Sequence, residues 1–227
     1  MAKRTDHRMY DLSAVLNVDA VSSIRPGSSI LVSGPAMTGK EDLLFDALAD
    51  GTQTGDGTVA VTTGGRAEDA IEDIQSRAPG ADSHALCAID CRADSDREEV
   101  ERDDDAYVHR VAAPSDMTGI GIGITKCFDR LHDAGVDDGR LGLTNLSTMV
   151  TYSDKQTVFK FCHVLSSRLD SAEFLGLFTI DSSAHDDQTL QVIKQAFDGL
   201  IEIRERDGTR EARAMGIQPQ PSEWVEL

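Results

Sequence analysis

The segment Gly34–Lys40 constrains the fold more than any other part of the chain. It reads GPAMTGK and fits the pattern G-x-x-x-x-G-K. The apolar run SILVS before it is typical of a buried strand, and the run DLLFDAL after it is typical of a helix. A glycine-rich turn that joins a strand directly to a helix is characteristic of βαβ units, so the chain is expected to contain a parallel sheet.

Apolar runs alternate with helical patterns along the rest of the chain. This alternation favours an α/β fold with a mostly parallel sheet flanked by helices. The predicted strands are Ser29–Ser33, Thr58–Thr62, Ala85–Asp90, Tyr107–Val111, Leu141–Asn145 and Leu175–Ile180. The predicted helices are Lys40–Ala49, Glu68–Arg77, Thr118–Ala134, Asp154–Leu169 and Gln188–Phe197. Around the turn Asp207-Gly208, the runs Leu200–Arg204 and Thr209–Met215 predict a C-terminal antiparallel hairpin.

The length of 227 residues, without an internal repeat or a long linker, predicts one domain. Residues 1–23 are interpreted as an N-terminal extension and residues 216–227 as a tail, in which Trp224 is expected to pack over the domain. The acidic stretch Arg92–Asp105 is expected to be a solvated loop. No stretch approaches about 18 apolar residues and no leader pattern is visible, so a soluble cytoplasmic protein without membrane contact is expected.

The charge of the chain is strongly acidic and biased in its residue types. The net charge is −18; 28 of the 40 acidic residues are Asp, and only 6 of the 22 basic residues are Lys. This composition is interpreted as adaptation to molar salt, where the Debye length is about 3 Å and surface charges repel weakly. Binding to DNA is not expected, because it requires clustered cations on phosphates.

The four cysteines are expected to have no metal or disulfide role. Cys87 lies in an apolar run that predicts a strand, and its spacing to Cys91 has no matching second pair for a metal site. A disulfide framework is not expected in a chain of this size without a secretory leader.

The Gly34–Lys40 segment is the candidate binding site for the phosphates of ATP or ADP. In such a loop, backbone N–H groups point into an anion-sized nest, and the following helix adds its positive N-terminal end. Lys40 would reach the β- and γ-phosphates. The candidate nucleotide-binding residues are Gly34, Pro35, Ala36, Met37, Thr38, Gly39, Lys40 and Glu41. The alternative is a glycine-rich strand-to-helix turn that binds nothing.

The position after Lys40 departs from the phosphate-loop pattern. The pattern has Ser or Thr there, whose hydroxyl ligates Mg²⁺, whereas this chain has Glu41. The Glu41 carboxylate is a candidate Mg²⁺ ligand, but it also brings negative charge close to phosphates. Alternatively, it only stabilises the first helical turn through the helix dipole.

Six segments of the chain resemble the RecA/KaiC-like P-loop proteins of halophilic archaea, including those labelled HTR-like. These segments are IRPGSSILVSGPAMTGKEDL, TVAVTT, SDMTGIGIGI, STMVTYSDKQTVFKF, FDGLIEI and QPSEW. The resemblance extends from about Ile24 to the C-terminus and implies a RecA-type ATPase core. It also implies head-to-tail assembly, as a homo-oligomer or with a related RecA-like protein, with the nucleotide at the junction.

The catalytic residues that the resemblance implies are changed in this chain. The family has paired acids after its second strand, one of them a general base, where this chain has Gly64 and Gly65. Glu68 follows, but it is expected to lie in the first turn of a helix. The family's Walker B strand ends in Asp, where this chain has Thr144 and Asn145.

The C-terminal hairpin of the family often offers basic residues to a neighbouring subunit's nucleotide. Arg213 is the candidate for this contact, while Met215 occupies another position that is often basic.

Three functions remain open from the sequence. The first is a nucleotide-binding regulatory or signalling module with little or no ATP hydrolysis, because general base, Mg²⁺ hydroxyl and Walker B acid are all changed. The second is an active ATPase with relocated groups, namely Glu41 on Mg²⁺ and Glu68 or Asp181 near the attacking water. The third is an interaction module that keeps the fold without a ligand.

Overall fold

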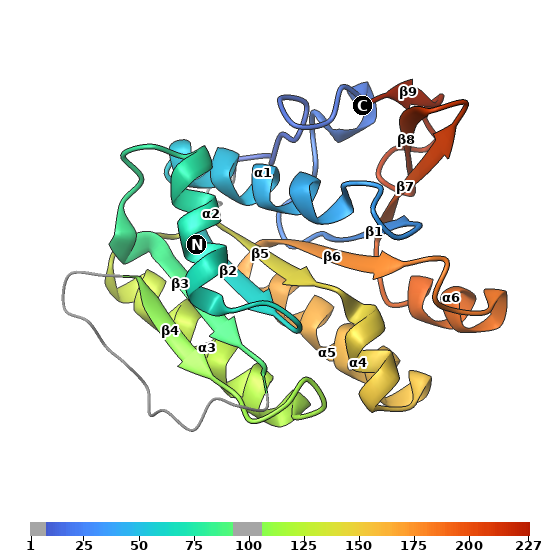
Figure 1. The fold of residues 1–227 in the computed structure, drawn as a ribbon. Coiled ribbons are helices and arrows are strands. Elements are labelled where there is room, and N and C mark those ends of the chain that lie inside the picture. The colour runs from blue at the N-terminus through green and yellow to red at the C-terminus, as the bar shows by residue number, and fades with distance from the viewer. Residues whose placement is uncertain (1–7, 93–105) are drawn as a thin grey trace, which may run out of the picture.

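The computed structural model describes residues 8–92 and 106–227 (Figure 1). Within these residues one sheet has the strand order β4-β3-β2-β5-β6-β1-β7-β8-β9. The strands are β1 Ser29–Gly34, β2 Gly57–Thr62, β3 Leu86–Asp90, β4 Tyr107–Arg110, β5 Gly139–Thr144, β6 Leu175–Asp181, β7 Gly199–Arg206, β8 Thr209–Met215 and β9 Val225–Glu226. The helices are α1 Lys40–Gln53, α2 Ala67–Arg77, α3 Met117–Asp133, α4 Leu146–Tyr152, α5 Lys155–Ala172 and α6 Asp187–Lys194, with 3-10 turns at Asp19–Val21 and Ser83–Ala85.

The sheet is parallel from β4 to β7 and antiparallel only at its C-terminal edge. β7 pairs with β1 in parallel, whereas β8 pairs antiparallel with β7 and β9 antiparallel with β8. The prediction of a mostly parallel α/β sheet with a C-terminal hairpin is therefore confirmed. Among the described residues, none of the helices has the length and apolarity needed to cross a membrane.

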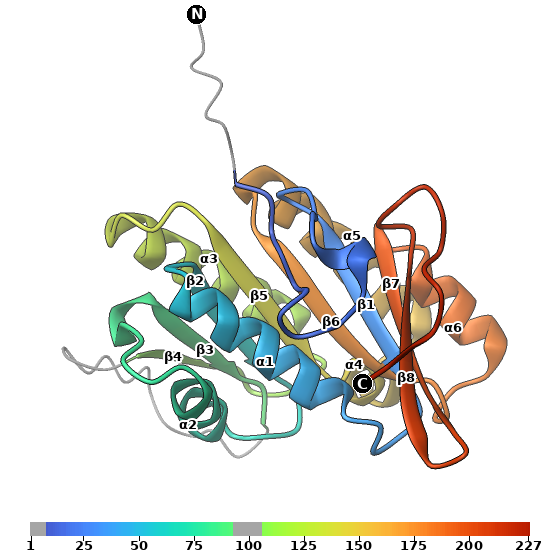
Figure 2. The same ribbon diagram turned by 90° about the horizontal axis from the view of Figure 1, so that it is seen from above.

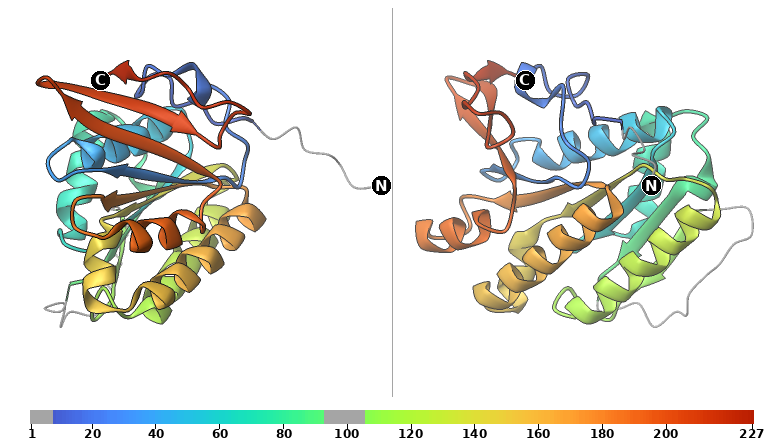
Figure 3. Two further views of the ribbon diagram at one scale, coloured as in Figure 1. Left: turned by 90° about the vertical axis from the view of Figure 1, so that its right-hand side faces the viewer. Right: turned by 180° about the vertical axis from the view of Figure 1, so that it is seen from behind.

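Helices cover both faces of the sheet and create two apolar cores. In β1, Ile30 and Val32 face one core while Leu31 faces the other, as the two-residue period of a strand requires. Helices α1 and α2 cover the first face, and α3, α5 and α6 cover the second (Figures 1 and 3). Because both faces are covered, the central strands β1, β2 and β5 are buried along their whole length, which explains why apolar runs such as LGLFTI are continuous rather than alternating.

Three details differ from the sequence predictions. Helix α4 was not expected; it has seven residues and lies between β5 and α5, where a connection was predicted. Asn145 does not end the strand but adopts a left-handed conformation, φ 58°, as the residue before α4. Helix α1 continues to Gln53 instead of ending at Ala49. Of the predicted acidic loop, residues 93–105 lie outside the described residues.

The segment interpreted as an N-terminal extension contributes to the core from Tyr10 onward. Its apolar side chains Tyr10, Leu12, Leu16, Val18 and Val21 are buried in the core that α1 covers. The Tyr10 hydroxyl donates to the Glu173 carbonyl (3.0 Å) and accepts from the Gly139 N–H (3.0 Å). Burial raises the pKa of Tyr10 above its ordinary value, so the hydroxyl stays protonated and able to donate.

Arg140 of β5 is a buried cation at the amino-terminal edge of the sheet. Its side chain is 1% exposed, and its guanidinium pairs with Asp56 (2.9 Å) and Asp50 (3.0 Å) and donates to the Ala47 carbonyl (2.6 Å). Gly51 makes room for it, since a Cβ at that position would collide with the Arg140 side chain. The guanidinium therefore ties β5 to α1 and to the turn before β2.

Replacing this cation is expected to destabilise the fold strongly. Arg140→Met leaves the buried Asp56 carboxylate with the half-exposed Arg8 at 3.6 Å as its cation, and breaking a buried pair in this way costs about 3–5 kcal/mol. Urea unfolding at constant KCl concentration measures this loss. The control is Arg206→Met, whose guanidinium lies at the exposed hairpin tip, 3.7 Å from Asp207. Equal stability of the two variants would contradict a structural role for the Arg140 pairs.

Candidate functional site

The candidate site lies at the carboxyl edge of the sheet, where the chain leaves β1 and β6. From β1 the chain crosses through α1 to β2, and from β6 it crosses through α6 to β7, in the opposite direction along the sheet. The two connecting helices therefore lie on opposite faces, and the loops that precede them separate at this edge (Figure 1). Ligands of open α/β sheets bind at such a reversal of strand order.

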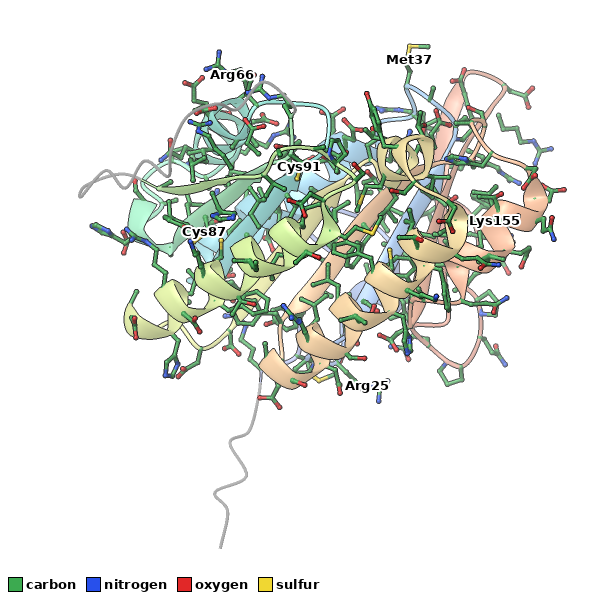
Figure 4. All side chains as sticks on the ribbon, turned by 90° about the horizontal axis from the view of Figure 1, so that it is seen from below. Arg25, Met37, Arg66, Cys87, Cys91 and Lys155 are labelled. Carbon is green, nitrogen blue, oxygen red and sulfur yellow. The ribbon has the colours of Figure 1, made fainter. Side chains whose placement is uncertain are left out.

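The loop after β1 has the geometry of a tight turn into a helix. Met37 and Gly39 adopt positive φ angles of 61° and 80°, and α1 begins at Lys40. The Thr38 hydroxyl donates to the Pro35 carbonyl (2.9 Å) and closes the turn. Gly34 is required here, since a Cβ would meet Thr38 Oγ1 and Ile203. The candidate residues 34–40 thus form one continuous loop, whose tip is the fully exposed Met37 (Figure 4).

Lys40 is buried beneath this loop and faces the end of β6. Its Nζ donates to the Pro35 carbonyl (2.9 Å). Asp181, the last residue of β6, pairs in register with Gly34. Burial raises the pKa of Asp181, but hydrogen bonds from Ser183 and the charges of Lys40 and His185 outweigh burial and hold this pKa below its usual value. The edge therefore carries a cation and a carboxylate close to the loop.

The loop after β6 is fixed by its own hydrogen bonds. Asp181 Oδ1 accepts from the Ser183 N–H (2.9 Å) and from the Ser183 hydroxyl (2.6 Å), and the Asp181 N–H donates to Ser147 Oγ (3.0 Å). The Ala36 N–H reaches Ser183 Oγ at 3.5 Å, so the loops after β1 and β6 touch. Asp181 is thus positioned at the candidate site, with one of its oxygens already bonded.

The end of β5 carries polar groups but no carboxylate. The Thr63 hydroxyl donates to the carbonyls of Thr144 (2.7 Å) and Asn145 (3.0 Å), and the Asn145 N–H donates to Thr179 Oγ1 (2.7 Å). Within the described residues, Asn145 Oδ1 is buried without a hydrogen-bond partner. Thr144 is the last residue of β5, which pairs with β6, and Asn145 follows it as the residue before α4.

Glu41 and Glu68 lie in different surroundings. Glu41 is exposed in the first turn of α1, next to the loop. Glu68 is in the first turn of α2, as expected, and its Oε1 accepts from Arg110 at 2.6 Å, while its Oε2 lies 3.7 Å from Arg66. Arg110 is on β4, and β3, β2, β5 and β6 lie between β4 and the loop-bearing β1. The arrangement brings Glu41 to the candidate site and holds Glu68 among arginines elsewhere along the edge.

Arg213, the candidate for a contact with a neighbouring subunit, is bonded within its own chain. Its guanidinium donates to Glu202 Oε2 from Nη2 (2.7 Å) and Nε (3.0 Å) and lies over the Trp224 ring, 4.6 Å from the centroid. Arg204 lies over the same ring (3.8 Å), so Trp224 packs over the hairpin as expected.

Sequence reasoning missed Arg210. This residue follows the hairpin turn on β8, and its guanidinium lies directly over Gly39, since a Cβ on Gly39 would collide with Arg210 Nη1. The hairpin stands beside β1 in Figure 2, which explains how a residue so distant in sequence reaches the loop. The sequence does show a basic residue two positions after the turn Asp207-Gly208, but that this residue reaches Gly39 depends on the register of the hairpin.

The ion pairs around Glu68 make the stability of the protein depend on pH. Asp90, the buried last residue of β3, accepts from Arg92 (2.8 Å) and lies 3.8 Å from Arg110. Burial raises the pKa of Asp90, but hydrogen bonds from Arg92 and the Ala67 N–H, together with the arginine charge, outweigh it and lower this pKa below its usual value.

A lowered carboxylate pKa stabilises the folded state above the pKa of the unfolded chain, about 3.9, and this stabilisation is lost as the pH falls through the folded value. We expect the free energy of unfolding to fall from about pH 5 downward, and Asp90→Asn to reduce both this slope and the stability at pH 7, the latter by about 1–3 kcal/mol. Urea unfolding midpoints from pH 7 to pH 3, for the unmodified protein and for Asp90→Asn, measure both effects. Asp133→Asn, at an exposed helix end, is the control, and an unchanged slope in Asp90→Asn would exclude this carboxylate as the cause.

Comparison with known proteins gives a family without an assigned activity. A family model described as "Family of unknown function (DUF7504)" matches residues 27–203, from the turn before β1 to within β7. The chain therefore belongs to DUF7504. No curated protein matches it. The matched range contains the loop, Lys40 and Asp181, whereas Arg210 and Arg213 lie beyond it.

Proposed function

We propose that this member of DUF7504 binds ATP or ADP through the Gly34–Lys40 loop of a RecA/KaiC-like core and hydrolyses it slowly or not at all. Such a protein would act as a nucleotide-dependent regulatory or signalling module. The observation that carries the proposal is the loop itself, a glycine turn between a central parallel strand and the first turn of a 14-residue helix, with a buried lysine at its base.

The backbone of the loop supports phosphate binding. The first N–H groups of α1 have no partners within the helix, and the helix dipole gives this end a partial positive charge. The positive φ angles of Met37 and Gly39 turn the chain so that neighbouring N–H groups can converge on an anion. Among the described residues, Lys40 Nζ makes one hydrogen bond, to the Pro35 carbonyl, and would exchange it for a phosphate oxygen.

The surroundings of the loop argue against rapid hydrolysis. Glu68, a candidate general base, is held by Arg110 and lies away from the loop. Thr144 and Asn145 supply no carboxylate at the end of β5. Phosphoryl transfer depends on a positioned base and on charge stabilisation, and removal of the base alone typically lowers the rate by about 10²–10⁴-fold.

Asp181 favours a second candidate function, an ATPase with relocated groups. It ends the strand next to β1, directly opposite Gly34, and its lowered pKa keeps it ionised at neutral pH. In that case Glu41 would ligate Mg²⁺ and Asp181 would lie near the attacking water, in place of the acids that RecA/KaiC-like proteins use. A nucleotide-free interaction module is the remaining alternative, because the bond from Lys40 to Pro35 also stabilises the loop without a ligand.

Nucleotide binding is expected to raise the melting temperature in a manner that depends on Lys40. At a ligand concentration about 100 times the dissociation constant, binding to the folded state alone adds about 2.7 kcal/mol, which is roughly 5 °C or more for a domain of this size. Thermal unfolding in about 2–3 M KCl with millimolar ATP or ADP measures this shift, the salt being chosen to match the acidic surface.

Lys40→Ala is expected to abolish the shift, while Lys160→Ala, on the exposed face of α5, is expected to keep it. A shift that survives in Lys40→Ala would place the nucleotide elsewhere. No shift in the unmodified protein would favour the nucleotide-free interaction module. Turnover in the same buffer that is lost in both Lys40→Ala and Asp181→Asn would favour the ATPase.

A further inference from the structure

We infer that the phosphates at this loop are neutralised by two side chains of the same chain, Lys40 and Arg210, so that the nucleotide binds without Mg²⁺. The inference rests on the proposed function. It adds a residue outside the range that the family model matches, and it assigns the form of the ligand, a metal-free nucleoside di- or triphosphate.

Arg210 reaches the loop because of the strand order. β7 pairs in parallel with β1, so its end lies at the same edge as the loop, and the turn at Asp207-Gly208 returns the chain along β8. Arg210 is the second residue of β8, and its backbone lies opposite Glu205 in the register of the hairpin. Its guanidinium comes to lie over Gly39, the residue directly before α1.

The guanidinium of Arg210 has no salt-bridge or hydrogen-bond partner within residues 8–92 and 106–227. By contrast, the other arginines of the hairpin are paired: Arg204 with Glu211 (2.7 Å), Arg206 with Asp207 (3.7 Å) and Arg213 with Glu202 (2.7 Å). The carboxylate nearest to the contact belongs to Asp42, whose Oδ1 pairs with Arg77 (3.3 Å) and whose Oδ2 lies on the side of Gly39. Arg210 is therefore available to a ligand.

The Arg210 guanidinium shares its surroundings with a positive helix end and with the carboxylates of Glu41 and Asp42, which lie in the first turn of α1. It lies at the N-terminal end of α1, where the helix dipole is positive, and Lys40 begins the same helix. Two cations and a helix N-terminus would all gain from an anion placed between them, and a guanidinium can donate two parallel hydrogen bonds to a phosphate. The convergence of these groups on Gly39 points to a phosphate as the missing partner.

The residues around the loop do not fit the usual Mg²⁺ site. The hydroxyl that follows the loop lysine is replaced by Glu41, whose side chain is exposed. The end of β5 offers a threonine and an asparagine in place of a carboxylate. Asp181 has one oxygen committed to Ser183. Mg²⁺ prefers six oxygen ligands in near-ideal octahedral geometry and normally takes one or two carboxylates together with the phosphates.

The test is a calorimetric titration of ATP and of ADP in the same KCl, once with EDTA and once with excess Mg²⁺. The unmodified protein is expected to bind at least as tightly in EDTA as in Mg²⁺, because the metal would compete with Lys40 and Arg210 for the phosphates. Arg210→Gln is expected to weaken binding in EDTA about tenfold, the usual effect of losing a charge-assisted hydrogen bond. Arg206→Gln, four residues away at the same hairpin tip, is the matched control and is expected to bind as the unmodified protein does.

Two results would overturn the inference while leaving the proposed function intact: Lys40-dependent binding that needs Mg²⁺, or equal affinities of Arg210→Gln and Arg206→Gln. Glu41→Gln tests whether Glu41 ligates Mg²⁺. If this variant loses binding only in the presence of Mg²⁺, Glu41 is a metal ligand and the inference is overturned. Absence of binding by the unmodified protein in both EDTA and Mg²⁺ would remove the proposed function together with the inference.

Discussion

The parallel pairing of β1 between β6 and β7 determines the position of every group at the candidate site. Pairing with β6 brings Gly34 level with Asp181, and pairing with β7 brings the hairpin turn to the same edge. Because the connections from β1 and β6 run in opposite directions along the sheet, α1 and α6 cannot both cover this edge. The loop is thus exposed at its tip, while its base is packed against the neighbouring strands.

Charge is distributed unevenly along this edge. At the β3–β4 side, Glu68, Asp90, Arg92 and Arg110 form a connected set of ion pairs, in which Glu68 Oε2 and Arg110 Nε are buried without a hydrogen-bond partner among the described residues. At the β1 side, and within the described residues, Lys40 Nζ bonds to the Pro35 carbonyl and Arg210 lies over a glycine. The two ends of the edge therefore differ in how their cations are held, because carboxylates pair with the arginines at the β3–β4 side, whereas in the described part of the chain no carboxylate pairs with Lys40 or Arg210 at the β1 side.

The sequence predicted the central strands well because burial on both faces leaves a simple signal. The runs of β2 and β6 are mostly apolar on both faces, and their short length distinguishes them from helices. The loop of residues 34–40 was predicted because its glycines are visible locally in the sequence: Gly39 adopts a positive φ angle, and Gly34 lies where a Cβ would meet Thr38 and Ile203.

The features that were missed depend on contacts between distant segments. Helix α4 is only seven residues long, too short for a helical period to emerge. The predicted strand began at Leu141 and so excluded Arg140, because nothing in the local sequence reveals that Asp50 and Asp56 pair with this arginine. Arg210 was missed because its position over Gly39 follows from the order of β1, β7 and β8. The residues interpreted as an extension have no regular period, yet Tyr10 fills a place between Gly139 and Glu173 that only the folded sheet creates.

The preference for arginine over lysine has a structural reason in this chain as well as a compositional one. Arg77 and Arg140 each bond to more than one acceptor at once, and Arg213 donates two hydrogen bonds to Glu202 Oε2, which a planar guanidinium can do and an ammonium does less well. A group fixed by several bonds cannot move without breaking all of them. Lys40 has a compact charge on a flexible stem and one bond to break, the one to Pro35. The lysine at the base of the loop is therefore suited to change partners, whereas the paired arginines are suited to remain in place.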